Sequence, residues 1–397
     1  MTTSLTIFAG TWCTEFPAHV TPWCVVDEQT SEKQRTPAWG RLVLVSVVAL
    51  LVAGTGVVLI PRDSGTPPAI PFSESARAHA FEDTLQLSES AAALAEASVP
   101  DTGKAGLEKA VTLLTTHARA LLDPADTSPS RSSTPLEPPA DGTPNAKPTR
   151  AALVTALAGS GQKRLDDARE ADGGIARLLA AVGSAQLLEA EELAAAWQLP
   201  APKQTPYSTS KGPSGSSVPA AGTSATACPS TTPIPDAAAA TTGTALAASV
   251  RAQQEAVYVY QVAVRRLDNT ATAARYLQVH EQMLQQAEAL TRASCTEVPA
   301  SEAGYRLPGK FAQDPASFLG ALESSSLPGF GDLVALGTGD TRDWAIDGLL
   351  AAARRSTAWG ADVPALPGIE LDAGNLPPLP TPGSTPGTAT GSKPGSR

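Results

Sequence analysis

Few residues in this chain have the type and spacing that catalysis requires. The sequence holds only four histidines, and one of them, His19, lies close to the N-terminus. It contains no glycine-rich phosphate loop, no GxSxG nucleophile elbow and no HExxH zinc motif. We therefore predict no catalytic residue, no cofactor and no bound metal, and we expect that the protein is not an enzyme.

His280 is the most informative of the histidines. It shares one face of a predicted helix with Tyr276, Met283 and other apolar residues that follow at steps of three or four. A buried imidazole needs a hydrogen-bond partner. An antiparallel hairpin that turns near residue 269 places Tyr260 within reach, so we predict a buried polar pair of Tyr260 and His280. A ligand or proton-shuttle role for His280 is the alternative.

Two of the four cysteines flank the same predicted helix hairpin. Cys228 precedes the first helix and Cys295 follows the second, and these positions lie at one end of an antiparallel pair. A disulfide between them would stabilise the fold by about 3–4 kcal/mol; two unpaired thiols are the alternative. Cys13 and Cys24 form only a weak zinc pattern, which we interpret as part of a disordered tail.

Alanine-rich helices must position these residues. Runs of strand-forming residues are nearly absent and aromatic residues make up 5% of the chain, so we predict an all-α protein. Segments rich in proline, serine and threonine bury too little apolar surface to fold. The predicted organisation is a disordered cytoplasmic tail (1–40), a transmembrane helix (41–61), a helical bundle (73–199) with a disordered insertion (123–148), a Pro/Ser/Thr-rich linker (200–237), a four-helix bundle (238–362) and a disordered tail (363–397).

Local signals set the expected helix boundaries. Asp314 followed by Pro315 predicts a helix start. We interpret the stretch 159–161 as a helix break and the glycine-spaced stretch 329–339 as the loop between the last two helices. The paired arginines 354 and 355 are interpreted as ordinary surface charge, with binding of phosphate groups as the alternative.

The two bundles have a similar spacing between a helical histidine and a closing tryptophan. The first runs from His117 to Trp197, and the second from His280 to Trp359. Such spacing is typical of a duplicated unit, although alanine-rich helices also match by chance. Both one bundle and two related antiparallel four-helix bundles therefore remain open as architectures.

Several stretches of the second bundle carry a family resemblance. They read RAQQEAVYVYQVAVRRL, AARYLQVHEQMLQQAEAL, GYRLPGKFAQDPASFLGALE and AAARRSTAW. On these residues, the segment 243–369 resembles an actinobacterial ferritin-like domain of unknown function. The resemblance implies an antiparallel four-helix bundle and no established activity.

Ferritin-like bundles that perform chemistry hold two metal ions, with a glutamate on each of two helices and a Glu-x-x-His motif on each of the other two. This sequence departs from that pattern. Gln253 stands at the first glutamate position, Leu277 stands three residues before His280, and the last helix has no histidine. We interpret Gln253 and Glu323 as vestigial ligand positions in a metal-free bundle.

An apolar run at residues 42–60 precedes the bundles and has the length of a membrane-spanning helix. Lys33, Arg35 and Arg41 lie just before it. Because basic residues stay on the cytoplasmic side, we expect a single-pass protein of the cell membrane, with a cytoplasmic N-terminus and extracytoplasmic bundles. A cleaved signal peptide is the alternative.

The net charge of −10 argues against nucleic acid as a partner. We predict a membrane-anchored extracytoplasmic scaffold or binding protein. Its expected partners are the membrane, through the single span, and an envelope protein or small ligand of unknown identity. The alternatives are a ferritin-like metal-dependent oxidase and a small-molecule or lipid carrier at the cell envelope.

Overall fold

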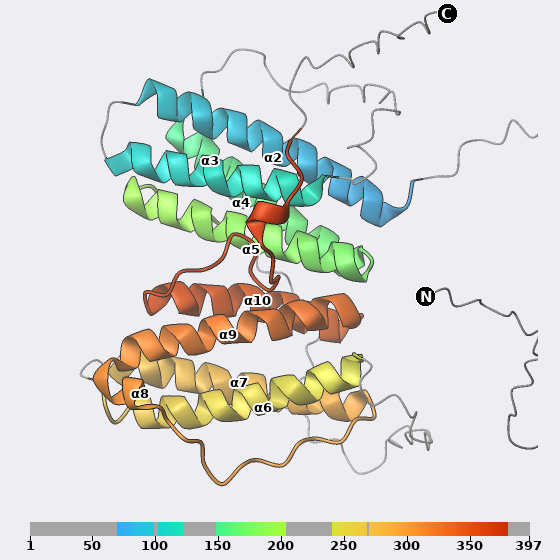
Figure 1. Cartoon of the computed structure of the whole chain (residues 1–397), viewed down its shortest axis with the longest axis vertical. Helices are drawn as coiled ribbons and strands as arrows, with labels where there is room; N and C mark the ends of the chain where they lie inside the picture. Colours follow the sequence, from blue (N-terminus) through green and yellow to red (C-terminus); the bar gives the residue numbers. More distant parts are fainter. Residues whose placement is uncertain (1–69, 99–101, 123–147, 204–239, 268–269, 380–397) are drawn as a thin grey trace, which may run out of the picture. The chain divides into compact units, whose positions relative to one another are not determined.

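The chain folds into α-helices joined by loops. The structure is a computed structural model and describes residues 70–98, 102–122, 148–203, 240–267 and 270–379. These ranges contain nine α-helices, one short 3-10 helix and no strand (Figure 1). The helices are α2 (Phe72–Ala97), α3 (Thr102–Leu121), α4 (Arg150–Glu170), α5 (Gly173–Ala196), α6 (Thr242–Ala263), α7 (Thr270–Ala293), α8 (Gly309–Gln313), α9 (Pro315–Leu336), α10 (Asp340–Ala358) and η1 (Ala373–Asn375).

Polar side chains define where several helices begin. The hydroxyl of Thr149 accepts a hydrogen bond from the backbone of α4, and Thr241 forms a reciprocal capping box with Thr244 at the start of α6. Asp314 caps α9, with Pro315 in its first turn. The predicted start of this helix is therefore confirmed. Each such cap contributes about 1 kcal/mol.

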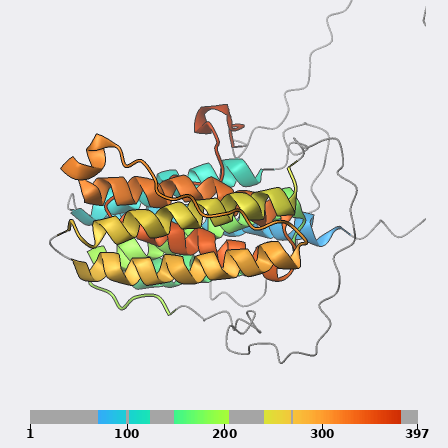
Figure 2. The same ribbon diagram turned by 90° about the horizontal axis from the view of Figure 1, so that it is seen from below.

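Consecutive helices pack in pairs: α2 with α3, α4 with α5, α6 with α7, and α9 with α10. Contacts between α2 and α4 join the first two pairs into a four-helix group, and contacts between α6 and α9 join the other two. The groups meet where α5 packs on α9 and where α10 contacts α4 and α5. Figure 1 shows the pairs following one another from α2 and α3 to α6 and α7, and Figure 2 shows their helices running side by side.

One buried apolar core spans both four-helix groups. It includes Leu165 and Leu179 from the first group and Leu333 and Leu349 from the second. Burying a side chain of this size stabilises the fold by about 1.5–3 kcal/mol. Since these side chains belong to one cluster, the two groups bury apolar surface against each other.

The predicted helix break at residues 159–161 is wrong. α4 continues through this stretch to Glu170. A Cβ atom added to Gly161 would lie 2.9 Å from the carbonyl oxygen of Gly183 on α5, and one added to Gly183 would lie 2.7 Å from that of Gly161. Glycine at both positions therefore permits the two backbones to approach closely. The helices separate instead at Ala171, whose carbonyl oxygen accepts a hydrogen bond from Arg342 at 2.6 Å.

The structure corrects the prediction of a membrane-spanning helix. Within the described ranges, no helix combines the length and the apolar character needed to cross a bilayer. The predicted span at 41–61, like the tail at 1–40, lies outside the described residues. The described part of the chain is thus all-α without a membrane-spanning helix, and the predicted single-pass localisation and membrane partner are not supported.

Two further expectations near the C-terminus differ from the structure. α9 runs through Gly329 and Gly331 as far as Leu336, so the connection to α10 is confined to residues 337–339. The predicted disordered tail begins at residue 363, but residues 363–379 are described and include the buried side chain of Leu366. The other segments predicted to be disordered lie almost entirely outside the described residues.

Candidate functional site

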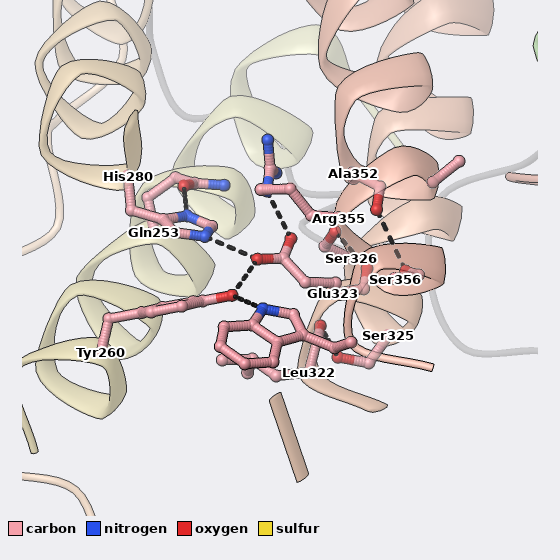
Figure 3. A network of polar contacts seen from close by, with 12 residues as sticks. Gln253, Tyr260, His280, Leu322, Glu323, Ser325, Ser326, Ala352, Arg355 and Ser356 are labelled. Atoms are coloured by element: carbon pink, nitrogen blue, oxygen red, sulfur yellow. Dashed lines mark hydrogen bonds and ion pairs between the residues drawn. The ribbon is translucent and has the colours of Figure 1, made fainter. Parts of the chain in front are cut away.

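Three helices of the second four-helix group bring the predicted polar residues together. Gln253 and Tyr260 lie on α6, His280 on α7 and Glu323 on α9. Gln253 and Tyr260 are two helical turns apart and therefore share one face of α6. All four residues are at most 3% exposed. Figure 3 shows the Glu323 carboxylate at the centre of the group.

The Glu323 carboxylate accepts hydrogen bonds from three other helices. Its Oε1 accepts from the Tyr260 hydroxyl at 2.7 Å and from Nε2 of His280 at 2.8 Å. Its Oε2 accepts from Nε of Arg355 on α10 at 2.9 Å. A buried carboxylate is costly unless its charge is paired and hydrogen-bonded. Here both oxygens have partners, and the carboxylate links α9 to α6, α7 and α10.

The predicted pair of Tyr260 and His280 is connected through Glu323. Their rings stack with centroids 4.8 Å apart, but the Tyr260 hydroxyl donates to the carboxylate and not to the imidazole. Nδ1 of His280 lies 2.8 Å from Oε1 of Gln253. The Gln253 amide has an acceptor and a donor, so it can form this hydrogen bond in either orientation of the amide.

Sequence reasoning missed Arg355 and Trp359. Arg355 is only 4% exposed, so its interpretation as surface charge is wrong. The indole of Trp359 donates to the Tyr260 hydroxyl at 2.8 Å. The available signal was spacing: Gly348, Ala352, Arg355 and Trp359 follow at steps of four, three and four, which places them on one helix face.

The electrostatics fix the protonation states of Glu323 and Tyr260. Burial raises the pKa of Glu323, but the hydrogen bond from His280 and the charge of Arg355 outweigh it, and the net pKa lies below its ordinary value. Burial, together with the negative charge of Glu323, raises the pKa of Tyr260 far above its ordinary value. Tyr260 therefore remains a neutral donor and Glu323 remains a charged acceptor.

The residues present do not fit a two-metal centre. Gln253 offers an amide where a carboxylate is needed, and Arg355 occupies the open side of Glu323 with a positive charge that repels metal cations. Asp343 and Asp347 of α10 are paired with Arg169 on α4. In the part of the chain that the structure describes, no three His, Cys, Asp or Glu side chains converge in a way that suits a metal ion.

The predicted disulfide falls only partly within the structure. Cys295 is disulfide-bonded. Cys228 lies outside the described residues, and so do Cys13 and Cys24. The pairing of Cys228 with Cys295 therefore stays a prediction.

A groove of about 830 Å³ runs between α4 and the segment 199–203. Its lining is largely apolar and includes Val154, Ala158 and Leu199, with Lys163 and Asp166 among the polar residues. None of the predicted site residues lines it. The groove is therefore separate from the Glu323 network.

The stretch of chain that carries the network matches a family model whose activity is undefined. Residues 245–371 match a domain of unknown function, DUF4439. All six network residues, Gln253, Tyr260, His280, Glu323, Arg355 and Trp359, lie within this stretch. The match covers less than half of the chain and supports the coarser part of the predicted resemblance, a domain of unknown function. No curated protein and no solved structure matches the chain.

Proposed function

We propose that this protein is a non-enzymatic helical scaffold or binding protein, in which the Glu323 network organises the second four-helix group. One observation carries the proposal: the Arg355 guanidinium donates to the Glu323 carboxylate at 2.9 Å, with both side chains buried. An active ferritin-like bundle neutralises its inward-facing carboxylates with metal ions. Here an arginine of the same chain supplies the positive charge.

The energetics favour a structural role. An unpaired buried charge costs several kcal/mol, and removing one partner of a buried pair typically costs about 3–5 kcal/mol. Arg355 and Glu323 each neutralise the other, and His280 and Tyr260 add hydrogen bonds. The network therefore stabilises one arrangement of the four helices relative to alternatives in which these side chains are buried without partners.

The rival proposal is a ferritin-like metal-dependent oxidase. Elemental analysis of the full chain, purified after growth with added iron and manganese, distinguishes the two. We expect far less than one tightly held ion per chain. About two iron or manganese ions per chain would overturn the proposal.

Two adjacent arginines provide a matched pair of variants. Arg355→Leu leaves the Glu323 carboxylate without its cation, so we expect a loss of about 3–5 kcal/mol in the free energy of unfolding. Arg354→Leu removes the half-buried neighbour that pairs with Glu191, and we expect a loss of about 0–1 kcal/mol. Equal losses in the two variants would show that the network does not organise the bundle.

A further inference from the structure

The segment that follows α10, residues 361–379, is here called the C-terminal strap. It leaves the second four-helix group and reaches the first, as Figure 1 shows. His117 on α3 donates from Nε2 to the carbonyl oxygen of Ala365 at 2.7 Å. Arg177 on α5 donates from Nε and Nη2 to the carbonyl oxygen of Gly368 at 2.8 and 2.6 Å.

A third side chain holds the far end of the strap. Arg119 on α3 donates from Nε to the carbonyl oxygen of Pro377 at 2.9 Å and from Nη2 to that of Leu376. All three side chains therefore bind backbone carbonyl groups. A carbonyl group is the same in every peptide, so this mode of recognition reads an extended chain and not one particular side chain.

The strap is anchored at its centre by Leu366, Pro367 and Gly368. Leu366 is 4% exposed, and the other two residues are also buried. Gly368 has a φ of +81°, a conformation that favours glycine. A Cβ atom on Gly331 of α9 would lie 2.9 Å from the carbonyl carbon of Gly368. Glycine at 331 therefore opens the space into which this carbonyl group fits.

The strap is acidic, but two basic side chains beside it already have acidic partners: Arg177 pairs with Asp332 on α9 at 2.7 Å, and Lys109 pairs with Glu192 on α5. The strap contains three acidic residues and no lysine or arginine: Asp362, Glu370 and Asp372. Arg119 and Arg177 bind it directly. Burial lowers the pKa of Lys109, but the hydrogen bond to Glu192 and the charge of Glu189 raise it above its ordinary value, and the charge of Asp362 in the strap adds less than these. Hydrogen bonds to backbone carbonyl groups, and not net charge, therefore determine what this surface binds.

We propose that α3, α5 and α9 form a peptide-binding groove, and that the strap is its intramolecular occupant. The partner that fits the groove is an extended peptide with an apolar residue followed by Pro-Gly. Such a peptide presents carbonyl groups to His117, Arg119 and Arg177 in the manner of the strap. Bound in this way, the strap is an autoinhibitory contact that closes the groove.

The covalent attachment of the strap determines whether a free peptide can compete with it for the groove. A segment attached to the same chain has an effective concentration in the millimolar range. A free peptide of equal affinity therefore cannot displace it at micromolar concentration. The site becomes measurable only when the strap is weakened and the groove is left intact.

The experiment uses a fluorescent synthetic peptide of residues 361–379 and the full chain. Leu366→Asp introduces a charge at the buried anchor and releases the strap. Leu371→Asp makes the same change at a leucine of the strap that is 47% exposed, and it is the matched control. Fluorescence anisotropy measures peptide binding, and circular dichroism verifies that each variant keeps its helices.

We expect the L366D chain to bind the peptide at least about tenfold more tightly than the wild-type or L371D chain. Adding Arg177→Ala to L366D removes two hydrogen bonds to the peptide and abolishes this gain, whereas adding Arg306→Ala, an exposed arginine outside the groove, preserves it. A folded L366D chain that binds no peptide would overturn the proposal and leave the strap as a purely structural element. If L366D does not fold, Leu366→Ala replaces it in the same binding experiment.

Discussion

Two buried side chains of the first four-helix group give opposite pH dependences to stability. Burial lowers the pKa of His117 from 6.5 to about 4, although its hydrogen bond to Ala365 opposes the shift. Burial raises the pKa of Glu189 from 4.5 to about 7, although the nearby ammonium of Lys109 opposes the shift. The folded chain therefore holds a neutral imidazole and a protonated carboxyl group in the range between these values.

The sign of each effect follows from proton uptake by the unfolded chain. Below pH 6.5 the unfolded chain protonates His117 and the folded chain does not, so stability is lost as the pH falls from 6.5 to 4. Above pH 4.5 the unfolded chain ionises Glu189 and the folded chain does not, so stability is lost as the pH rises from 4.5 to 7. Each loss reaches about 3 kcal/mol, and the two slopes of about 1.4 kcal/mol per pH unit cancel where they overlap.

Urea unfolding at several pH values between 4.5 and 7.5 measures this cancellation. Glu189→Gln removes the loss at higher pH, so its free energy of unfolding rises relative to wild type by about 1.4 kcal/mol for each pH unit up to 7. His117→Gln keeps an N–H group for the carbonyl oxygen of Ala365 and removes the loss at lower pH, so it gains relative to wild type as the pH falls. The free energy of unfolding of the double variant should differ from that of wild type by a constant amount over the pH range in which the two slopes overlap.

The comparison with wild type cancels the titration of every other group. It requires that the dependence of stability on urea concentration stays the same in all variants. A difference between wild type and Glu189→Gln that is constant over this pH range would show that Glu189 is ionised in the folded chain. A constant difference between wild type and His117→Gln would show that His117 is charged in the folded chain at the lower pH values.

Three further predictions test the packing and the covalent links. Gly331→Ala forces the strap away from α9, and we expect a loss of about 1–3 kcal/mol in the free energy of unfolding; Gly329→Ala, where an added Cβ atom meets nothing within 4 Å, should stabilise the same helix by up to about 1 kcal/mol. Tyr260→Phe leaves the Trp359 indole without its acceptor, and urea unfolding should show a loss of about 1–3 kcal/mol, clearly more than for Tyr258→Phe on the same helix. Peptide mapping of the unreduced protein should join the peptides that contain Cys228 and Cys295, and a link from Cys295 to another cysteine would contradict the predicted pairing.

Helical spacing predicted one half of the Glu323 network and missed the other. His280 faces inward because apolar residues follow it at steps of three and four, and Gln253 and Glu323 were found by comparison with a known arrangement of ligands. Arg355 satisfies the same spacing rule, but long charged side chains are usually solvated, so spacing alone does not predict that Arg355 is buried. Its burial depends on a carboxylate from another helix, a contact that lies 32 residues away in the sequence.

Backbone contacts were the least predictable features. Gly161 was interpreted as a helix break because glycine weakens isolated helices, whereas here it permits α4 and α5 to touch. The strap was interpreted as disordered because its composition is rich in proline and glycine. Its order comes from side chains on α3 and α5 that bind its carbonyl groups, and no local pattern in residues 361–379 reveals those donors.

The contact between His117 and the strap also has a consequence for synthesis. His117 and Ala365 are separated by 248 residues, so at about 5–20 residues per second the ribosome needs about 10–50 s to supply the acceptor after the donor has been made. In the later part of that interval α3 and α5 have both been made but lack the segment that contacts them. The nascent chain thus passes through a stage in which the donors on α3 and α5 exist without the backbone carbonyl groups that they bind in the folded protein.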